Sequence, residues 1–241
     1  MSHAKVALVT GAGQRVGRAL AEALAADGYR VGVHYRASRE GADACVAAIR
    51  ARGGEAEAFA ADLSDARACE QLVDDVYTRF DGLDLLVNSA AGMEKTRLGH
   101  TTAGQFDAII ALNLRAPFLL AQAAARVMPA GSAIVNIADH MAEEPWPDYS
   151  VHSIAKAGVM AMTRHLAAAL APDIRVNAIA PGFVLAPPGM PQDRVDAFAA
   201  DTPLQRIGTP DDVVHTLRYL VTASFVTGET LFVDGGRRVR P

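Results

Sequence analysis

The hydrophobic positions of this 241-residue chain alternate between two kinds of segment along its length. Short apolar runs, typical of strands buried on both faces, lie at 6–10, 30–35, 58–63, 83–87, 133–137, 174–178 and 229–233. Longer segments with helical spacing separate them, at 18–27, 38–52, 64–80, 101–127, 148–171 and 209–222. The alternation predicts an α/β fold, a single Rossmann-type doubly wound parallel sheet of about seven strands with helices on both faces.

Polar residues indicate several boundaries within this pattern. Ser38 and either Thr101 or Thr102 are expected to cap helices, and Pro210 suits the first turn of the helix that begins at Thr209. No repeat or linker divides the chain, so residues 1–241 are predicted to form one domain. The proline-rich, irregular stretch 183–192 follows a predicted strand, where such sheets bind ligands, and we expect a substrate lid at about residues 183–202.

Composition and charge exclude several classes of protein. Hydrophobic residues make up 51% of the chain, enough for a large core, and the net charge of −4 argues against a nucleic-acid partner. The two cysteines lie in predicted helices, which favours a reduced cytoplasm over a disulfide framework. The apolar stretches 116–125 and 166–172 are too short to span a membrane, and residues 1–10 are typical of a strand rather than a signal peptide. No spacing of His, Cys or Asp indicates a metal site.

A glycine-rich segment lies between the first strand and the first helix. Gly11, Gly13 and Gly17 would let the backbone approach a pyrophosphate at a helix N-terminus, although an ordinary turn could carry the same triplet. An NAD site would place Asp or Glu about 20 residues further on. This chain has Arg36 and Ser38 there, with Arg15 in the loop, and these side chains suit a 2′-phosphate. The sequence therefore predicts NADP(H) as the cofactor.

The predicted helix 148–171 carries three titratable side chains at helical spacing. Tyr149, His152 and Lys156 would share one face, beside small residues that let another surface approach. An imidazole beside an ammonium suits the delivery of a proton. An ordinary solvated helix face is the alternative, just as Asp139 could either face a substrate or simply brace its loop.

Together these motifs resemble the short-chain dehydrogenase/reductase family over nearly the whole chain. The matching segments are the glycine loop, Asp62-Leu63, Asn88-Ser-Ala-Ala91, Asn113, Pro181-Gly182 and Val233-Asp-Gly-Gly236. Within the family the chain is most similar to the pteridine reductases and the related bacterial dihydromonapterin and dihydrofolate reductases. Those proteins have Arg at the position of Arg15, a stretch like His34-Tyr-Arg-Ala-Ser38, and Asp at the position of Asp139 in place of the usual Ser.

The resemblance implies a role for each matching residue. The cofactor would be bound by Gly11, Gln14, Arg15, Val16, Gly17, His34, Tyr35, Arg36, Ser38, Asp62, Leu63, Asn88, Ala90, Lys156, Pro181, Gly182 and Val184. The catalytic residues would be Asn113, Asp139, His152 and Lys156, with Lys156 on the nicotinamide ribose and Asn113 positioning Lys156 through water. Substrate contacts would come from Arg15, Met93, Tyr149 and Met190.

Two positions depart from the family pattern. His152 stands where the family has its catalytic Tyr, so we expect His152 to be the proton donor and the enzyme to have an acid-leaning pH optimum. Met93 stands near the position where pteridine reductases place an aromatic ring. Both departures concern the substrate and leave the predicted fold unchanged.

Three functions are compatible with this pattern. The first is an NADPH-dependent reductase of a pterin- or folate-like C=N bond, and the second is a carbonyl reductase acting on 3-oxoacyl compounds or small ketones. The third is a catalytically weak NADP-binding sensor or partner subunit, which the replaced Tyr makes plausible. The resemblance also implies a homo-oligomer, a tetramer or a dimer, assembled through the helices at 101–127 and 148–171, with a small-molecule substrate.

Overall fold

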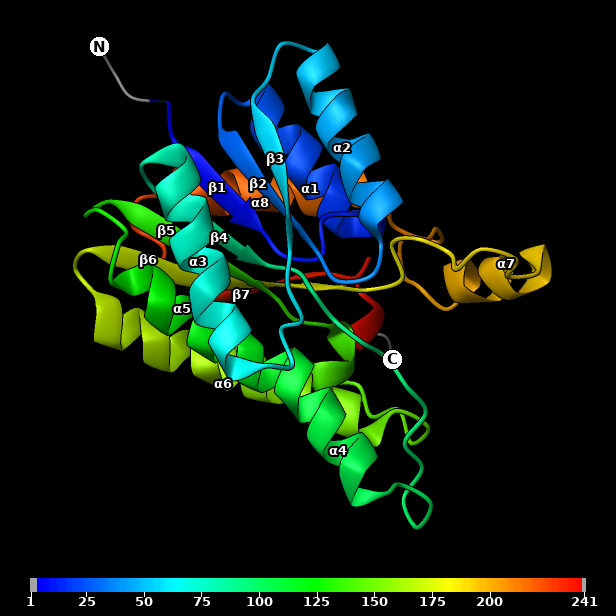
Figure 1. Ribbon diagram of the computed structural model, residues 1–241. Helices are drawn as coiled ribbons and strands as arrows, with labels where there is room; N and C mark the ends of the chain where they lie inside the picture. The colour runs from blue at the N-terminus through cyan, green and yellow to red at the C-terminus, as the bar shows by residue number, and fades with distance from the viewer. Residues whose placement is uncertain (1–3, 240–241) are drawn as a thin grey trace.

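The computed structural model describes residues 4–239 and contains one parallel sheet (Figure 1). Its seven strands lie in the order β3-β2-β1-β4-β5-β6-β7. Their bounds are β1 Val6–Val9, β2 Arg30–Tyr35, β3 Ala56–Ala60, β4 Leu85–Asn88, β5 Ser132–Ile137, β6 Ile174–Pro181 and β7 Thr230–Val233. Every neighbouring pair is parallel. The predicted doubly wound fold is confirmed, and the order reverses between β1 and β4, which is where such sheets bind ligands.

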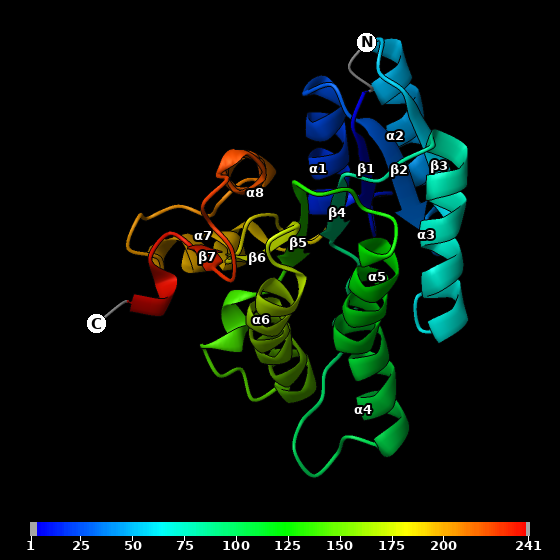
Figure 2. The same cartoon turned by 90° about the vertical axis from the view of Figure 1, so that its left-hand side faces the viewer.

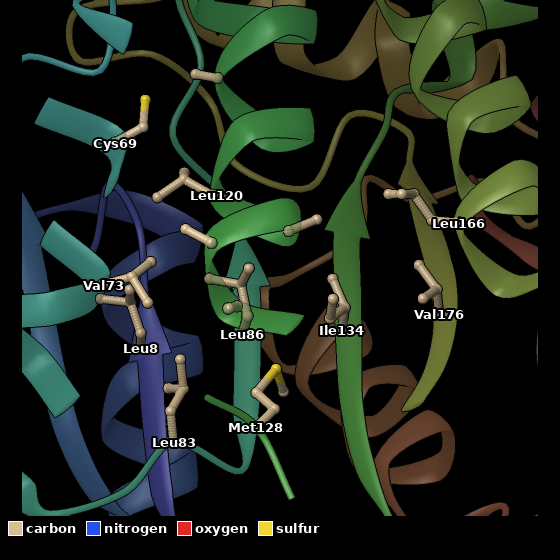
Figure 3. Close-up of a cluster of buried hydrophobic side chains, with 14 of the residues drawn as sticks. Leu8, Cys69, Val73, Leu83, Leu86, Leu120, Met128, Ile134, Leu166 and Val176 are labelled. Carbon is tan, nitrogen blue, oxygen red and sulfur yellow. The ribbon is translucent and has the colours of Figure 1, made fainter. Parts of the chain in front are cut away.

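Helices cover both faces of the sheet (Figure 2). One face packs against α1 (Arg15–Ala26), α2 (Arg39–Ala51) and α8 (Pro210–Thr222). The opposite face packs against α3 (Ala66–Phe80), α5 (Ala116–Ala125) and α6 (Ser150–Leu170). Figure 3 shows part of this second core, in which Leu8, Leu86 and Ile134 of the sheet lie beside Leu120 of α5. Two separate apolar layers therefore hold the sheet rigid and fix the ends of its strands.

Several boundaries differ from the sequence prediction. The third strand begins and ends earlier than predicted, because β3 pairs with β2 from Ala56 to Ala60. Ser38 precedes α2 but its side chain makes no capping hydrogen bond. Tyr149 lies outside α6, with φ −131° and ψ 35°, so the helical spacing that linked it to His152 does not apply. Thr102 and Thr209 do cap their helices, each within a capping box.

The predicted helix 101–127 has a π-helical turn in its middle. It runs from α4 (Ala103–Ile110) through the turn Ala111–Arg115 into α5. Pro117 lacks the N–H that an α-helix would use to bind the carbonyl of Asn113, and its ring would crowd that carbonyl, so the wider turn relieves both problems. The turn places Asn113 in a buried position.

Because α4, the π-helical turn and α5 form one continuous helix, this segment is longer than its apolar stretch 116–125 suggested. The apolar stretch 116–125 is part of the longer helix Ala103–Ala125, which is long and apolar enough to cross a membrane by length and composition alone. Half of the tested window is buried inside the domain, and a core helix passes the same test.

The predicted lid contains a helix that the sequence pattern did not indicate. α7 (Gln192–Ala200) has no fully buried residue, and its apolar positions Val195, Phe198 and Ala199 share one face but are only half-buried. Figure 1 shows α7 projecting from the body of the domain. Phe198 of α7 stacks on Phe183 at a centroid distance of 4.3 Å and lies parallel to Trp146 at 6.2 Å. Aromatic packing therefore attaches the lid to the loop after β5.

Candidate active site

A cleft of about 480 Å³ opens where the carboxyl ends of the strands meet. It is lined by the loops after β1, β2, β4, β5 and β6 and by one face of α6. The structure brings most of the residues singled out from the sequence to this cleft: Gly11, Gln14, Arg15, Val16, Gly17, His34, Tyr35, Arg36, Ser38, Leu63, Ala90, Met93, Asp139, His152, Lys156, Pro181, Gly182 and Val184. The sequence analysis did not assign Gly92, Leu112, Ile137 or Ala138, which also line it.

Five of the expected site residues lie away from the cleft wall. The Asp62 carboxylate accepts bonds from the backbone and side chain of Ser64. Asn88 is buried below the cleft and donates to Asn136, while Tyr149 packs against the ring of Trp146. Met190 lies in the turn before α7. Asn113, the fifth, is buried in the π-helical turn. None of these five residues is among those that line the cleft.

The glycine loop packs tightly against the residues that directly follow β4. Gly11 has φ +66°, and a Cβ atom there would lie 2.8 Å from the Cα of Ala90. A Cβ on Gly17 would collide with the carbonyl of Gly11. The hydroxyl of Thr10 accepts bonds from the backbone N–H groups of Ser89 and Ala90 at 2.9 and 3.0 Å. A side chain at either position would therefore push apart the backbone segments that pack here.

His34 has a structural task in this loop. Its Nδ1 accepts from the backbone N–H of Gly11 at 3.0 Å, which leaves Nε2 as the donor to the carbonyl of Ala61 at 3.1 Å. Burial lowers the pKa of His34, although its bond to Ala61 opposes the effect, and this agrees with a neutral ring. Both nitrogens are occupied, so His34 holds the glycine loop to the end of β3 and has no polar atom left for a cofactor.

Arg15 connects the glycine loop to the lid. It has φ +53°, a left-handed backbone conformation that is uncommon outside glycine. Its guanidinium donates to the carbonyl of Leu185 at 2.7 Å and to that of Ala186 at 3.4 Å. The side chain also lines the cleft. Arg15 therefore lies where it could contact either a phosphate or the first residues of the lid.

The titratable centre of the cleft is formed by Asp139, His152 and Lys156. Asp139 follows β5, and its Oδ2 lies 3.5 Å from Nε2 of His152. Nδ1 of His152 lies 3.2 Å from the carbonyl of Gly92, so this nitrogen carries a proton. Nζ of Lys156 donates to the carbonyl of Ile137 at 2.7 Å. The predicted sharing of a helix face by His152 and Lys156 is confirmed, and both side chains are buried.

Burial and neighbouring charges shift the pKa values of Asp139 and Lys156 in opposite directions. Burial raises the pKa of Asp139, but bonds from His140 and His152 outweigh it and leave the pKa well below its ordinary value. Burial lowers the pKa of Lys156 to about 8, and the negative charge of Asp139 opposes that shift. Asp139 is thus an anion whose negative charge can stabilise both the ammonium of Lys156 and a protonated imidazole of His152.

Asn113 positions the loop beside His152. Its Nδ2 donates to the carbonyls of Gly92 and Ile109, each at 3.0 Å, and its Oδ1 accepts from the N–H of Gly92 at 3.3 Å. The same Gly92 carbonyl is the partner of His152. Asn113 thus fixes the acceptor that orients the imidazole of His152, whereas the resemblance implied an action on Lys156 through water.

The cleft fits a dinucleotide by its own geometry. The glycine loop and the first residues of α1 line the cleft together, and a helix N-terminus beside a glycine loop can bind a phosphate. Arg36 and Ser38 line the same cleft next to this loop. Among residues 4–239, no group of three or more His, Cys, Asp or Glu side chains is arranged to hold a metal ion. A parallel sheet with such a loop is typical of Rossmann-type nucleotide-binding proteins.

Comparison with known proteins identifies the family. A family model described as enoyl-(acyl carrier protein) reductase matches residues 11–238. The chain is 39% identical to a 3-oxoacyl-[acyl-carrier-protein] reductase of a Synechocystis strain, over 97% of this chain and 96% of the relative. It is 38% identical to an uncharacterized oxidoreductase of Methylorubrum extorquens, over 97% and 98%.

Solved structures give the same result. A dehydrogenase/reductase from Sinorhizobium meliloti superposes with a TM-score of 0.93 at 36% identity, covering 98% of this chain and 96% of that one. A blue fluorescent protein from a metagenomic library, solved in complex with NADPH, superposes with a TM-score of 0.92 at 32% identity, covering 97% of each chain. The chain belongs to the short-chain dehydrogenase/reductase family and is an oxidoreductase, as its sequence predicted.

Proposed function

We propose that this protein is an NADPH-dependent carbonyl reductase that converts a ketone, such as a 3-oxoacyl compound or a small keto compound, to an alcohol. The observation that carries the proposal is that His152, Lys156 and Asp139 line the same cleft as the glycine loop. The 39% identity to a 3-oxoacyl-[acyl-carrier-protein] reductase over nearly the full length of both chains supports a carbonyl substrate.

The pterin hypothesis has less support. The Arg15 guanidinium, which would stack on or bind a pterin, is bonded to two lid carbonyls. The side chain at the expected stacking position is Met93, which is half exposed and is not an aromatic ring. Asp139, which could bind a pterin ring, is engaged by two histidines. The carbonyl-reductase alternative therefore replaces the pterin hypothesis as the favoured function.

NADP(H) is the cofactor, and the chain has side chains for both ends of it. The loop at Gly11 and Gly17 would hold the pyrophosphate, and Arg36 with Ser38 would bind the 2′-phosphate. Lys156 would hold the nicotinamide ribose. The reduced nicotinamide supplies a hydride to the carbonyl carbon when it is bound.

The protein must supply a proton to the carbonyl oxygen as that hydride arrives. His152 is the group in the position to do so, because its ring is buried at the cleft and Gly92 and Asp139 fix its orientation. Asp139 stabilises the protonated ring. The ammonium of Lys156 adds a positive field that stabilises negative charge developing on the oxygen. Its lowered pKa of about 8 still leaves most Lys156 side chains charged at neutral pH.

The direct test is NADPH oxidation by the purified protein with three substrate groups: 3-oxoacyl thioesters, small ketones, and dihydrobiopterin with dihydrofolate. We expect turnover of a ketone that is lost in His152→Ala. Turnover of the pterins alone would restore the pterin hypothesis. A wild type that binds NADPH without turning over any of these, combined with activity in His152→Tyr, would identify a cofactor-binding relative that has lost its proton donor.

The same family membership supports a homo-oligomer in the cytoplasm. Phe106, Phe118 and Ile154 are 42%, 44% and 56% exposed on α4, α5 and α6, the helices through which the sequence predicted assembly. Light scattering coupled to size-exclusion chromatography should give the mass of a dimer or a tetramer. A monomer at micromolar concentration would refute this part of the proposal.

A further inference from the structure

Asp139 lies between two buried histidines, and only His152 has a role in the proposed reaction. On one side its Oδ2 is 3.5 Å from Nε2 of His152, and on the other its Oδ1 is 3.0 Å from Nδ1 of His140. His140 is 5% exposed and follows Asp139 directly in the chain. Its ring makes an edge contact with Trp146 at a centroid distance of 5.8 Å. His140 therefore has a fixed place beside the catalytic carboxylate.

The two histidine rings are held in the same way. Nδ1 of His140 lies 3.3 Å from the carbonyl of Pro181, just as Nδ1 of His152 lies 3.2 Å from that of Gly92. A carbonyl only accepts, so each Nδ1 carries a proton. Each Nε2 is buried and faces a carboxylate oxygen at long range, Oε2 of Glu144 at 3.6 Å for His140 and Oδ2 of Asp139 at 3.5 Å for His152. When Nε2 of either ring also carries a proton, both nitrogens of that ring direct an N–H toward an oxygen.

The charged groups around His140 differ from those around His152, so they do not stabilise the two protonated rings equally. Nε2 of His140 lies 3.6 Å from Oε2 of Glu144. Glu144 is itself paired with Arg237, whose guanidinium donates at 2.8 and 3.2 Å and also lies 3.0 Å from Asp201. Lys156, four residues after His152 on α6, lines the same cleft and adds a further positive charge there. Asp139 is the carboxylate that both rings approach, so protonation of one ring weakens the hold of Asp139 on a proton at the other.

We propose that His140 is a positioning residue that competes with His152 for the negative charge of Asp139 and thereby sets the pH range in which His152 is protonated. The inference rests on the proposed function for its significance in the reaction. Glu144 takes part because its carboxylate favours the protonated form of His140. Loss of either side chain should leave Asp139 to act on His152 alone.

The carboxylate would keep its place without His140. The backbone N–H of Met141 donates to Oδ1 of Asp139 at 2.9 Å, which leaves Oδ2 directed at His152. Glu144→Gln removes a negative charge and retains an amide oxygen that can accept from Arg237. His140→Gln and Glu144→Gln should therefore act in the same direction. In both, the pH midpoint of His152 should rise by about one pH unit, the size expected for strongly interacting sites.

The experiment is an NMR titration of protein with isotope-labelled histidine rings, without cofactor or substrate, from about pH 5 to 9, a range that spans the reference histidine pKa. The resonance of His152 is assigned by its loss in His152→Gln. His215→Gln, an exposed position on α8, is the matched control and should not move the midpoint. A midpoint of His152 that stays in place or falls in both His140→Gln and Glu144→Gln would overturn the proposal.

Two further measurements keep the test independent of folding and of catalysis. Thermal unfolding shows whether each variant is folded, and if the buried His140→Gln is not, Glu144→Gln carries the test. In the wild type, the resonances of His140 and His152 should each show two titration steps, and independent single steps would also refute the coupling. Failure of ketone reduction would refute the proposed function without changing any of these titrations.

Discussion

The packing of Gly17 against the glycine loop gives a prediction whose size can be worked out. Gly17 lies in the first turn of α1, and a Cβ atom there would come within 3.0 Å of both the carbonyl oxygen and the carbonyl carbon of Gly11. The obstructing atoms are backbone, so α1 and the loop would have to move apart. Such overpacking typically costs about 1–3 kcal/mol.

A matched substitution isolates that cost. Gly104 also lies in the first turn of a helix, α4, but nothing lies within 4 Å of the place its Cβ would take. Ala for Gly in a helix is worth up to about 1 kcal/mol, and this gain is common to Gly17→Ala and Gly104→Ala. The difference in unfolding free energy between the two variants is therefore the overpacking cost. For a chain of this size each kcal/mol corresponds to a Tm difference of about 2–4 °C.

Two assays check the argument. Thermal unfolding should place Gly17→Ala several degrees below Gly104→Ala, with the wild type between them or close to the latter. Titration of NADPH fluorescence should show that Gly17→Ala weakens binding by at least about tenfold, or ~1.4 kcal/mol, because the displaced Gly11 moves the phosphate loop. Gly104→Ala should bind NADPH like the wild type. If the two variants unfold together and bind NADPH equally, the proposed loop packing is wrong.

Further predictions concern charge at the cleft and the lid. Wild-type protein should bind NADPH more tightly than NADH. Arg36→Ala should reduce that preference by roughly 10–100-fold, which corresponds to the loss of a hydrogen bond to a charged group. Wild-type affinities for the two cofactors that differ by less than about threefold would contradict this prediction. His152→Tyr should change the pH profile of ketone reduction, because a phenol and an imidazole have different reference pKa values; superimposable pH profiles of the wild type and the variant would remove His152 as donor. Arg237→Met breaks the buried ion pair to Glu144 and a second pair to the exposed Asp201, and the loss of the buried pair should lower the free energy of unfolding by about 3–5 kcal/mol. Protease cleavage of the lid should also become faster, and an unchanged Tm and cleavage rate would show that the pairs contribute nothing.

Much of the fold could be predicted from local pattern because local pattern determines it. Apolar runs separated by helical periodicity require a parallel sheet covered on both faces, and Thr102 and Thr209 begin helices because their hydroxyls bond N–H groups three residues later. The glycine loop was recognisable because its glycines lie between an apolar run and a helical pattern, although Ala90 and His34, which hold Gly11, are distant in sequence. The helix α7 was missed because it is short, and its apolar face of Val195, Phe198 and Ala199 follows an irregular proline-rich stretch.

The roles of several polar residues were decided by contacts that no local pattern records. His34 is a brace because Ala61 and Gly11 happen to present a carbonyl and an N–H to its two nitrogens. Asn113 acts on Gly92 because the π-helical turn beside Pro117 directs it there.

By itself, the sequence determined the class of fold, the nucleotide loop and the group of His152, Lys156 and Asp139 at one cleft. Only the tertiary structure decided that Asp139 is shared by two histidines, and that Glu144 meets Arg237 across 93 positions of the chain. The physical reason is that backbone conformation follows from neighbouring residues, whereas the charge state of a buried group depends on whichever distant side chains the packed domain places around it.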